Sequence, residues 1–181
     1  MKINLIIPAR YASTRFPGKP LAKINGQTML SRVVDMAVSA SENDRDIGIT
    51  VATEDERIMA HCEELDVSCL MTSDMCRTGT DRVIEALESL SPKPDFVINI
   101  QGDTPFTPPD IVRKIIEACR NKPSCDIITP IHQLNWDELD NLRERKKQTP
   151  FSGTTVTITA DYKALWFSKN ILPAIRKETD L

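Results

Sequence analysis

Three cationic side chains are concentrated in one short stretch near the start of the chain. The stretch PARYASTRFPGKP, residues 8–20, contains Ala9, Arg10, Ser13, Thr14, Arg15, Gly18 and Lys19. Arginine offers forked N–H donors, lysine adds a point charge, and small residues let backbone N–H groups face an anion. The stretch therefore predicts a polyphosphate site, although it matches neither GxxxxGK[ST] nor GxGxxG. The alternative is a solvated charged loop of ordinary turn residues.

A single carboxylate follows an apolar run in the middle of the chain. Asp103 lies in QGDTP, residues 101–105, directly after FVINI. One carboxylate together with substrate phosphates is a common way to hold Mg²⁺, so Asp103 is a candidate ligand for that ion. The alternative is an aspartate that caps the next turn.

A third polar loop precedes a helix-like segment. The stretch CRTGTDR contains Arg77, Thr78, Gly79, Thr80 and Arg82. The glycine and the two hydroxyls would let a ligand approach closely, and either arginine could reach a phosphate or a carboxylate. A helix N-terminus also favours anions. The alternative is a capped helix start with exposed arginines.

The elements that would position these loops alternate between strands and helices. We predict strands at 3–7, 46–53, 67–72, 95–100 and 126–131, and helices at 28–40, 54–65, 81–90 and 109–121. Thr28 is the expected N-cap of the first helix, and Thr78 or Thr80 that of the third. Such βα units predict an α/β fold with a mostly parallel sheet and helices on both faces. The three loops would then meet at the carboxyl edge of the sheet, where ligands bind.

The pattern changes after residue 131. Residues 132–153 show no clear period and predict a surface excursion or a partly mobile loop. TTVTITA, 154–160, alternates polar and apolar residues and predicts a strand with one wet face. Residues 161–170 predict a turn followed by a short helix.

Composition excludes several classes of protein. The length of 181 residues suits one domain, and a net charge of −3 argues against a nucleic-acid binder. No apolar run is long enough to span a bilayer, and MKINLIIPAR lacks the features of a signal peptide, so we expect a cytoplasmic protein. The cysteines show no CxxC pair and predict mostly buried free thiols without a metal site. Neither His61 nor His132 is assigned a role.

The motifs taken together resemble one family. IIPARYASTRFPGKPLAKINGQTML, VATEDE, MTSDMCRTGTDRV, FVINIQGDTP and ALWFSK are similar, in order and spacing, to 3-deoxy-manno-octulosonate (Kdo) cytidylyltransferases, the CMP-Kdo synthetases. The resemblance covers residues 1–131 and, more weakly, 152–175. Acylneuraminate cytidylyltransferases open with a similar PAR loop, but RYASTRFPGKPL favours the Kdo enzymes. The resemblance implies a Rossmann-like nucleotide-diphospho-sugar transferase fold. It would be a single domain, with 1–131 as the nucleotide-binding core and 132–181 as a partial sugar-side and dimerisation region.

The resemblance also implies roles for individual residues. The expected site residues are Arg10, Arg15 and Lys19 on the CTP phosphates, Asp103 on Mg²⁺, Gln101 on nucleotide or sugar, Arg77, Thr78, Gly79 and Thr80 on the cytidine side, Lys169 facing the sugar acid, and Ala9, Ser13 and Gly18 in the substrate-binding loop. The anomeric hydroxyl of the sugar would attack the α-phosphorus of CTP and release pyrophosphate, a step of lipopolysaccharide biosynthesis. The partners would be CTP, a small sugar acid and a second copy of the chain, with no nucleic acid and no membrane.

The chain departs from the family pattern in three places. Thr104 stands where the family has a glutamate, and Thr155 where it has a lysine. The family's last third, with a second metal carboxylate, is expected to be missing. The alternatives are therefore a non-catalytic or partner-dependent CTP-binding fragment or paralogue, an acylneuraminate-type enzyme, or a nucleotidyltransferase for another nucleotide or sugar.

Overall fold

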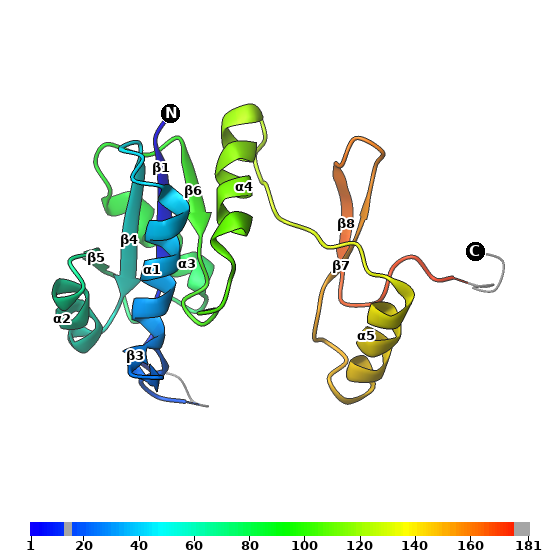
Figure 1. Ribbon diagram of the computed structural model, residues 1–181, viewed down its shortest axis with the longest axis horizontal. Helices are drawn as coiled ribbons and strands as arrows, with labels where there is room; N and C mark the ends of the chain where they lie inside the picture. The colour runs from blue at the N-terminus through cyan, green and yellow to red at the C-terminus, as the bar shows by residue number, and fades with distance from the viewer. Residues whose placement is uncertain (13–15, 176–181) are drawn as a thin grey trace. The chain divides into compact units, whose positions relative to one another are not determined.

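The computed structural model describes residues 1–12 and 16–175. The chain divides into two compact units, Met1–Pro130 and Ile131–Leu181. The division lies next to the boundary at 131/132 expected from the sequence. The expectation that the two units form a single domain stays a prediction. Figure 1 shows the elements of both units.

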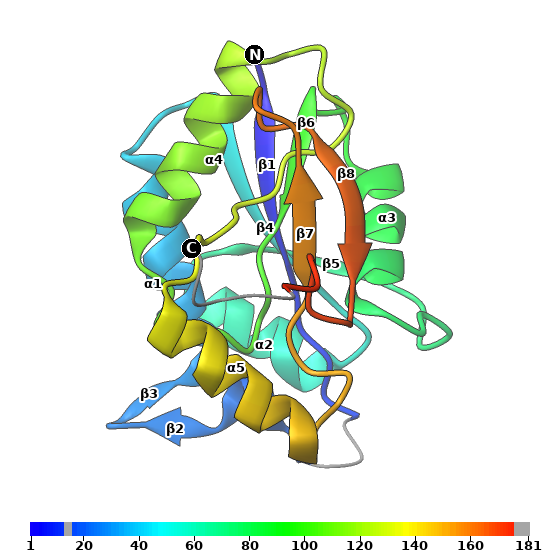
Figure 2. The ribbon, with the colours of Figure 1, turned by 90° about the vertical axis from the view of Figure 1, so that its right-hand side faces the viewer.

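The first unit is built on a four-stranded sheet. Its strands are β1 (Ile3–Pro8), β4 (Ile47–Thr53), β5 (Ser68–Met71) and β6 (Phe96–Asn99). They pair in the order β5-β4-β1-β6, and every pair in this sheet is parallel, in agreement with the predicted mostly parallel sheet. Figure 2 shows β4, β1 and β6 side by side. The chain builds outward from β1 through β4 and β5 and then returns to place β6 on the other side of β1. Sheets with such a reversal bind ligands in the crevice beside it, here between the ends of β1 and β6.

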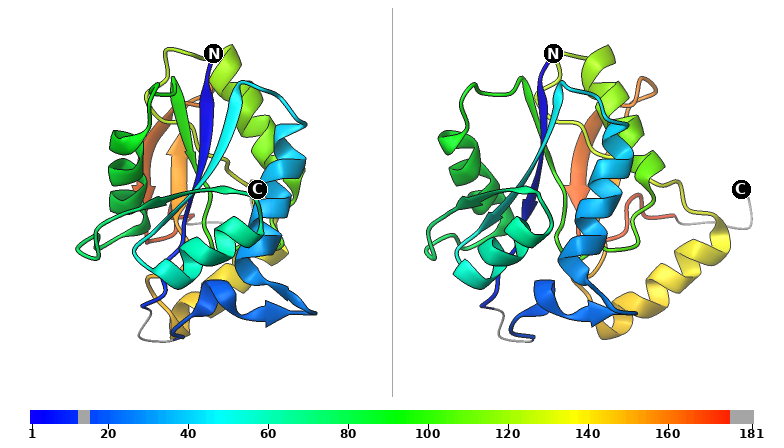
Figure 3. Two further views of the ribbon diagram at one scale, coloured as in Figure 1. Left: turned by 90° about the vertical axis from the view of Figure 1, so that its left-hand side faces the viewer. Right: turned by 60° about the vertical axis from the view of Figure 1, so that its left-hand side comes forward.

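Helices cover both faces of this sheet, which confirms the expected fold class. The helices are α1 (Met29–Ser41), α2 (Glu56–Glu64), α3 (Gly79–Ser89) and α4 (Pro109–Asn121). Side chains of α1, α2 and α4 join the larger buried cluster, and those of α3 join the smaller one. Leu5 and Ile7 of β1 belong to the larger cluster and Ile6 to the smaller, because successive side chains of a strand point to opposite faces. Figure 3 shows α3 on one face and α1 with α4 on the other.

The helix starts follow from capping chemistry. Thr28 caps α1 as predicted, since its side chain accepts a hydrogen bond from the Ser31 N–H. Thr78 is the N-cap of α3, so Thr80 lies inside that helix. The chain between β1 and α1 holds a 3-10 turn, η1 (Lys19–Leu21), and a small antiparallel pair, β2 (Lys23–Ile24) and β3 (Gln27–Thr28). These short elements tie the cationic loop to α1.

The strand expected at residues 126–131 is absent, and that prediction is wrong. These residues pair with no strand in the described parts of the chain. Ile127 is 85% exposed, so the apolar residues that suggested a buried strand are not all buried. An apolar run becomes a strand only where a neighbouring strand can pair with it.

The second unit differs from the sequence prediction in two further places. Its elements are α5 (Trp136–Gln148), β7 (Thr155–Ile158) and β8 (Ala164–Ser168). Instead of a loop at 132–153 there is α5, which buries only Leu142 and therefore has no apolar period to detect. It begins with a capping box at Asn135, and its acidic first turn and basic last turn suit the helix dipole. The strand at 154–160 is confirmed as β7, whereas residues 164–168 form β8 instead of a helix, in keeping with the strand preference of Trp166 and Phe167.

Candidate functional site

A cavity opens at the carboxyl edge of the parallel sheet. Its volume is about 370 Å³. It is lined by Pro8, Ala9, Arg10, Ala12, Lys19, Pro20, Cys76, Arg77, Thr78, Gly79, Arg82, Gln101, Gly102 and Asp103. All three loops singled out in the sequence therefore contribute to one cavity, beside the reversal of strand order between β1 and β6.

The three loops meet around Pro8, the last residue of β1. A Cβ on Gly102 would lie 2.6 Å from the Pro8 carbonyl oxygen, so only glycine lets the loop after β6 come this close. On the other side, a Cβ on Gly79 would lie 3.4 Å from Pro8 Cγ, which is ordinary contact. The end of β1 is thus the common support of the cavity.

Opposite charges lie within the cavity wall. Lys19, at the start of η1, donates from Nζ to Asp103 Oδ2 over 2.8 Å. The two side chains are 35% and 57% exposed, so both side chains remain accessible to a ligand. Arg10 and Arg77 are exposed and add two further cations to the lining. A cavity with three accessible cations, besides the buried Arg82, and one accessible carboxylate suits an anion that carries a metal.

In the described part of the first loop, several backbone N–H groups have partners within the protein. The Tyr11 and Ala12 N–H groups donate to Glu54 Oε1 over 3.0 and 3.4 Å. The Gly18 N–H donates to the Tyr11 carbonyl over 2.9 Å. The protein itself already uses these three donors, and a backbone cradle formed by the rest of the loop stays a prediction. The side chains of Arg10 and Lys19 carry positive charge from this loop into the cavity.

The side chain of Arg82 is buried and paired with other residues of the protein. Its side chain is 2% exposed, its Nη2 lies 2.9 Å from Glu54 Oε2, and its Nη1 donates to Thr72 Oγ1. A buried guanidinium needs such partners to offset its lost hydration. Of the two arginines that the sequence offered as anion ligands, the exposed Arg77 is therefore the one free to reorient toward a ligand.

The third loop is both a capped helix start and a wall of the cavity. Thr78 Oγ1 accepts from the Asp81 N–H, and Asp81 Oδ2 accepts from the Thr78 N–H, which lowers the pKa of Asp81. Glu85 of α3 accepts from the Cys76 thiol over 3.0 Å and from the Ser73 N–H over 2.6 Å. The thiol is the main cause of the lowered pKa of Glu85, and the same bond raises the pKa of Cys76. Helix α3 thereby fixes the loop that lines the cavity.

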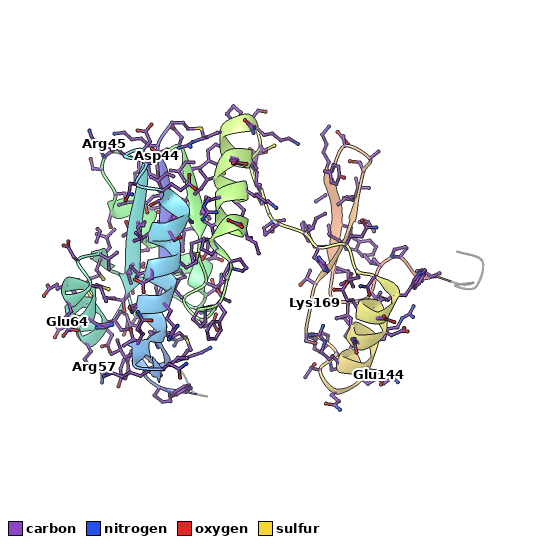
Figure 4. All side chains as sticks on the ribbon, in the orientation of Figure 1. Asp44, Arg45, Arg57, Glu64, Glu144 and Lys169 are labelled. Atoms are coloured by element: carbon purple, nitrogen blue, oxygen red, sulfur yellow. The ribbon has the colours of Figure 1, made fainter. Side chains whose placement is uncertain are left out.

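The structure brings together most of the residues proposed from the sequence. Those that line the cavity are Ala9, Arg10, Lys19, Arg77, Thr78, Gly79, Gln101 and Asp103. Gly18 and Thr80 are neighbours of lining residues and do not line the cavity themselves. Ser13 and Arg15 lie outside the described residues. Lys169 belongs to the second unit, where its Nζ donates to Thr154 Oγ1 over 2.7 Å (Figure 4). The individual roles of all these residues stay predictions.

Sequence reasoning missed Glu54. The sequence places Glu54 in the motif VATEDE and at the start of the helix predicted at 54–65, without a role of its own. In the structure it directly follows β4 and contacts both Arg82 and the first loop. Its position was the available signal, because Glu54 follows a parallel strand at the same edge of the sheet as Asp103 does.

The donor set fits Mg²⁺ held largely by a ligand. In residues 1–12 and 16–175, no group of three or more His, Cys, Asp or Glu side chains is placed to hold a metal ion. Asp103 offers one accessible carboxylate, which matches the mode in which substrate phosphates supply further ligands.

The five cysteines are free, and Cys62, Cys76 and Cys119 are buried. No helix in the described parts of the chain combines the length and apolar character needed to cross a bilayer.

Comparisons with known proteins identify the family. A family model described as cytidylyltransferase matches residues 4–181. The chain is 41% identical over 177 residues to the 3-deoxy-manno-octulosonate cytidylyltransferase of Maricaulis maris (strain MCS10), covering 98% of this chain and 67% of that protein. It is 37% identical over 168 residues to the protein of the same name from Chlamydia trachomatis serovar L2, covering 93% of this chain and 62% of that protein.

A solved structure agrees with these relatives. The structure of CMP:2-keto-3-deoxy-manno-octonic acid synthetase complexed with CTP matches with a TM-score of 0.85 and 28% identity, over 100% of this chain and 69% of that chain. The chain thus spans about two thirds of the length of the proteins it matches. The resemblance inferred from the motifs is confirmed, and with it the nucleotide-diphospho-sugar transferase fold. The chain belongs to the cytidylyltransferase family.

Proposed function

We propose that this chain is a nucleotidyltransferase that joins CTP to Kdo or a related 2-keto-3-deoxy sugar acid, giving the CMP-sugar and pyrophosphate. The observation that carries the proposal is the convergence of Arg10, Lys19 and Arg77 on one cavity that also contains Asp103. The negative charge of a triphosphate matches these cations, and a divalent ion is a suitable partner for the carboxylate. The choice of cytosine and of the sugar acid rests on the family relationship.

The chemistry requires positioning and charge stabilisation. The guanidinium of Arg10 and the ammonium of Lys19 bind phosphate oxygens of CTP. Arg77, in the loop before α3, approaches the bound nucleotide. The anomeric hydroxyl of the sugar acid attacks the α-phosphorus, the bond to the bridging oxygen breaks, and pyrophosphate leaves as the hydroxyl proton passes to solvent. The cations offset the negative charge that spreads over the phosphate oxygens during this displacement. The side chain of Gln101, beside Asp103, is available to orient nucleotide or sugar.

Asp103 is the residue that would hold Mg²⁺. When bound, the ion would neutralise charge on the phosphate oxygens. Lys19 holds only Oδ2 of Asp103, and an exposed ion pair of this kind is weak enough to exchange when Asp103 takes the ion. Lys19 then turns its ammonium to a phosphate, so that one ligand satisfies both side chains.

The setting of the reaction is part of the same proposal. We place it in the cytoplasm, as a step toward lipopolysaccharide, with the chain acting as a homodimer. The support for these points is the family relationship, whose relatives bear the name of the Kdo enzyme.

Product formation tests the proposal. The chain is incubated with CTP, Mg²⁺ and Kdo, and pyrophosphate release is compared with a control that lacks the sugar. Sugar-dependent release that needs Mg²⁺ and falls when UTP, ATP or GTP replaces CTP is the expected result. Tight Mg²⁺-dependent CTP binding without release would instead support the non-catalytic, partner-dependent alternative.

A further inference from the structure

A largely buried carboxylate lies directly behind the loop that follows β1. Glu54 is the first residue after β4, and its side chain is 10% exposed. One oxygen, Oε1, accepts from the backbone N–H groups of Tyr11 and Ala12 over 3.0 and 3.4 Å. The other, Oε2, lies 2.9 Å from Arg82 Nη2. Glu54 thus joins the backbone of the cationic loop to a guanidinium from α3.

Arg82 makes this connection rigid. Its guanidinium is 2% exposed and also donates to Thr72, the residue directly after β5. The Thr72 N–H in turn donates to the Thr53 carbonyl at the end of β4 over 2.8 Å. A buried guanidinium requires a compensating charge, and Glu54 supplies it. The carboxylate is therefore held in place by the edge of the sheet, independently of the loop that it anchors.

A second contact from the same segment holds the loop. The guanidinium carbon of Arg57 lies 3.3 Å from the centre of the Tyr11 ring. Asp55 fixes that guanidinium by two hydrogen bonds of 2.9 and 2.7 Å. The Tyr11 carbonyl accepts from the Gly18 N–H, next to Lys19. Tyr11 is thus held at its N–H, its carbonyl and its ring, between the two lining cations Arg10 and Lys19.

We propose that Glu54 is a positioning residue of the nucleotide site, an inference that rests on the function proposed above. Glu54 acts through the loop and not on the substrate. By fixing Tyr11 and Ala12 it sets the direction in which Arg10 enters the cavity, and through the Tyr11–Gly18 bond it fixes the start of η1 and Lys19. Residues such as Tyr11 and Ala12 that are held in place before the ligand arrives lose less entropy on binding, which strengthens binding without a new contact.

The test compares two changes of equal charge. Glu54→Gln removes the anchoring carboxylate, and Glu56→Gln removes an exposed one two residues further on. Two quantities are measured: the Kd for CTP with Mg²⁺ by calorimetry, and amide hydrogen exchange at Tyr11 and Ala12 in the absence of nucleotide. In Glu54→Gln we expect exchange at these amides to be faster by about tenfold or more, and the Kd to rise by about tenfold. Glu56→Gln is expected to change neither.

A conservative variant separates positioning from folding. Glu54→Asp keeps a negative charge beside Arg82 and shortens the reach to the loop by one methylene. We expect it to fold and to recover part of the lost CTP affinity. A role in stability alone would lower the melting temperature of these variants and leave the Kd of the folded protein unchanged.

The outcomes are distinct. A folded Glu54→Gln protein with the Kd of the unchanged chain overturns the proposal, as does unchanged exchange at Tyr11 and Ala12. Should Glu54→Gln fail to fold, Glu54→Asp with unaltered Kd and exchange overturns it equally. If the unchanged chain itself binds no CTP, the proposed function fails, and that failure is visible before any variant is made.

Discussion

The ammonium nitrogen of Lys19 lies 2.8 Å from Oδ2 of Asp103, although the two residues are 84 positions apart in the sequence. The loops after β1 and β6 meet in this pair, because the two strands are neighbours in the sheet. Both side chains are accessible, so the pair contributes little to stability, about 0–1 kcal/mol. Its importance is in placement: the side chains assigned to phosphate and to Mg²⁺ lie within reach of one ligand.

Lys19→Met should weaken CTP binding without unfolding the chain. The substitution removes a cation from the cavity and keeps the aliphatic stem, so the free energy of unfolding should change by less than about 1 kcal/mol. The Kd for CTP with Mg²⁺, measured by calorimetry, should rise by about tenfold or more. Arg120→Met is the matched control. Arg120 donates to Asp44 over 2.6 Å, and neither residue lines the cavity. Equal CTP affinities for Lys19→Met and Arg120→Met would contradict the assignment.

Asp103→Asn should separate nucleotide binding from its dependence on Mg²⁺. The amide keeps the shape of the side chain and loses the charge that holds the ion. We expect an unchanged melting temperature, and CTP binding that no longer strengthens when Mg²⁺ is added. Turnover in the pyrophosphate assay should fall by about a hundredfold or more. A fully active variant would exclude Asp103 as the essential metal ligand.

Gly102→Ala should disturb the support of the cavity. The added Cβ would lie 2.6 Å from the Pro8 carbonyl oxygen, so the end of β1 or the loop after β6 must move. We expect the free energy of unfolding to fall by about 1–3 kcal/mol, together with weaker CTP binding. Gly79→Ala is the control for stability, because its Cβ would make only ordinary contact with Pro8. Urea unfolding of both variants checks this, and equal stabilities would contradict it.

The contribution of Glu85 to stability should depend on pH. The Cys76 thiol and the Ser73 N–H lower the pKa of Glu85, so the charged form stabilises the folded chain. This contribution is present above the unfolded pKa, about 4.3, and is lost as the pH falls through the lower folded pKa. Glu85→Gln should therefore be less stable than the unchanged chain at pH 7, and the gap should close toward about pH 3.

Urea midpoints at the two pH values measure this gap. Glu88→Gln, an exposed change on the same helix, should show no gap at either pH. A gap for Glu85→Gln of equal size at pH 7 and pH 3 would show that the charge of Glu85 is not its cause.

The first unit, with its parallel sheet, could be predicted because local sequence signals and tertiary structure agree there. The strand at 3–7 is apolar except at Asn4 because both faces of β1 are covered, and Thr28 caps α1 through its own side chain. One place where agreement failed is an element without an apolar face. Helix α5 buries only Leu142 and depends on its capping box and on ion pairs such as Arg143–Asp140. Periodicity of apolar residues cannot reveal such a helix.

The residues of the site could be predicted from the sequence, but the contacts between them could not. Arg10, Lys19 and Asp103 were recognisable because their types suit phosphate and Mg²⁺ and because they follow strands. That Lys19 pairs with Asp103 depends on the order of strands in the sheet, which the sequence does not state. The burial of Arg82 against Glu54 depends likewise on the placement of α3 over the sheet. Long-range pairs of this kind follow from topology, so residue type and spacing do not reveal them.

The most direct test of the account is a calorimetric titration of the chain with CTP and Mg²⁺. The account predicts one CTP site per chain, with a Kd within the range typical of enzyme KM values, roughly 1 µM to 1 mM. It also predicts that Arg10→Met and Lys19→Met each weaken binding, while Arg120→Met does not. Absence of CTP binding, or binding that survives both substitutions in the cavity, would contradict the claim that these three loops form the nucleotide site.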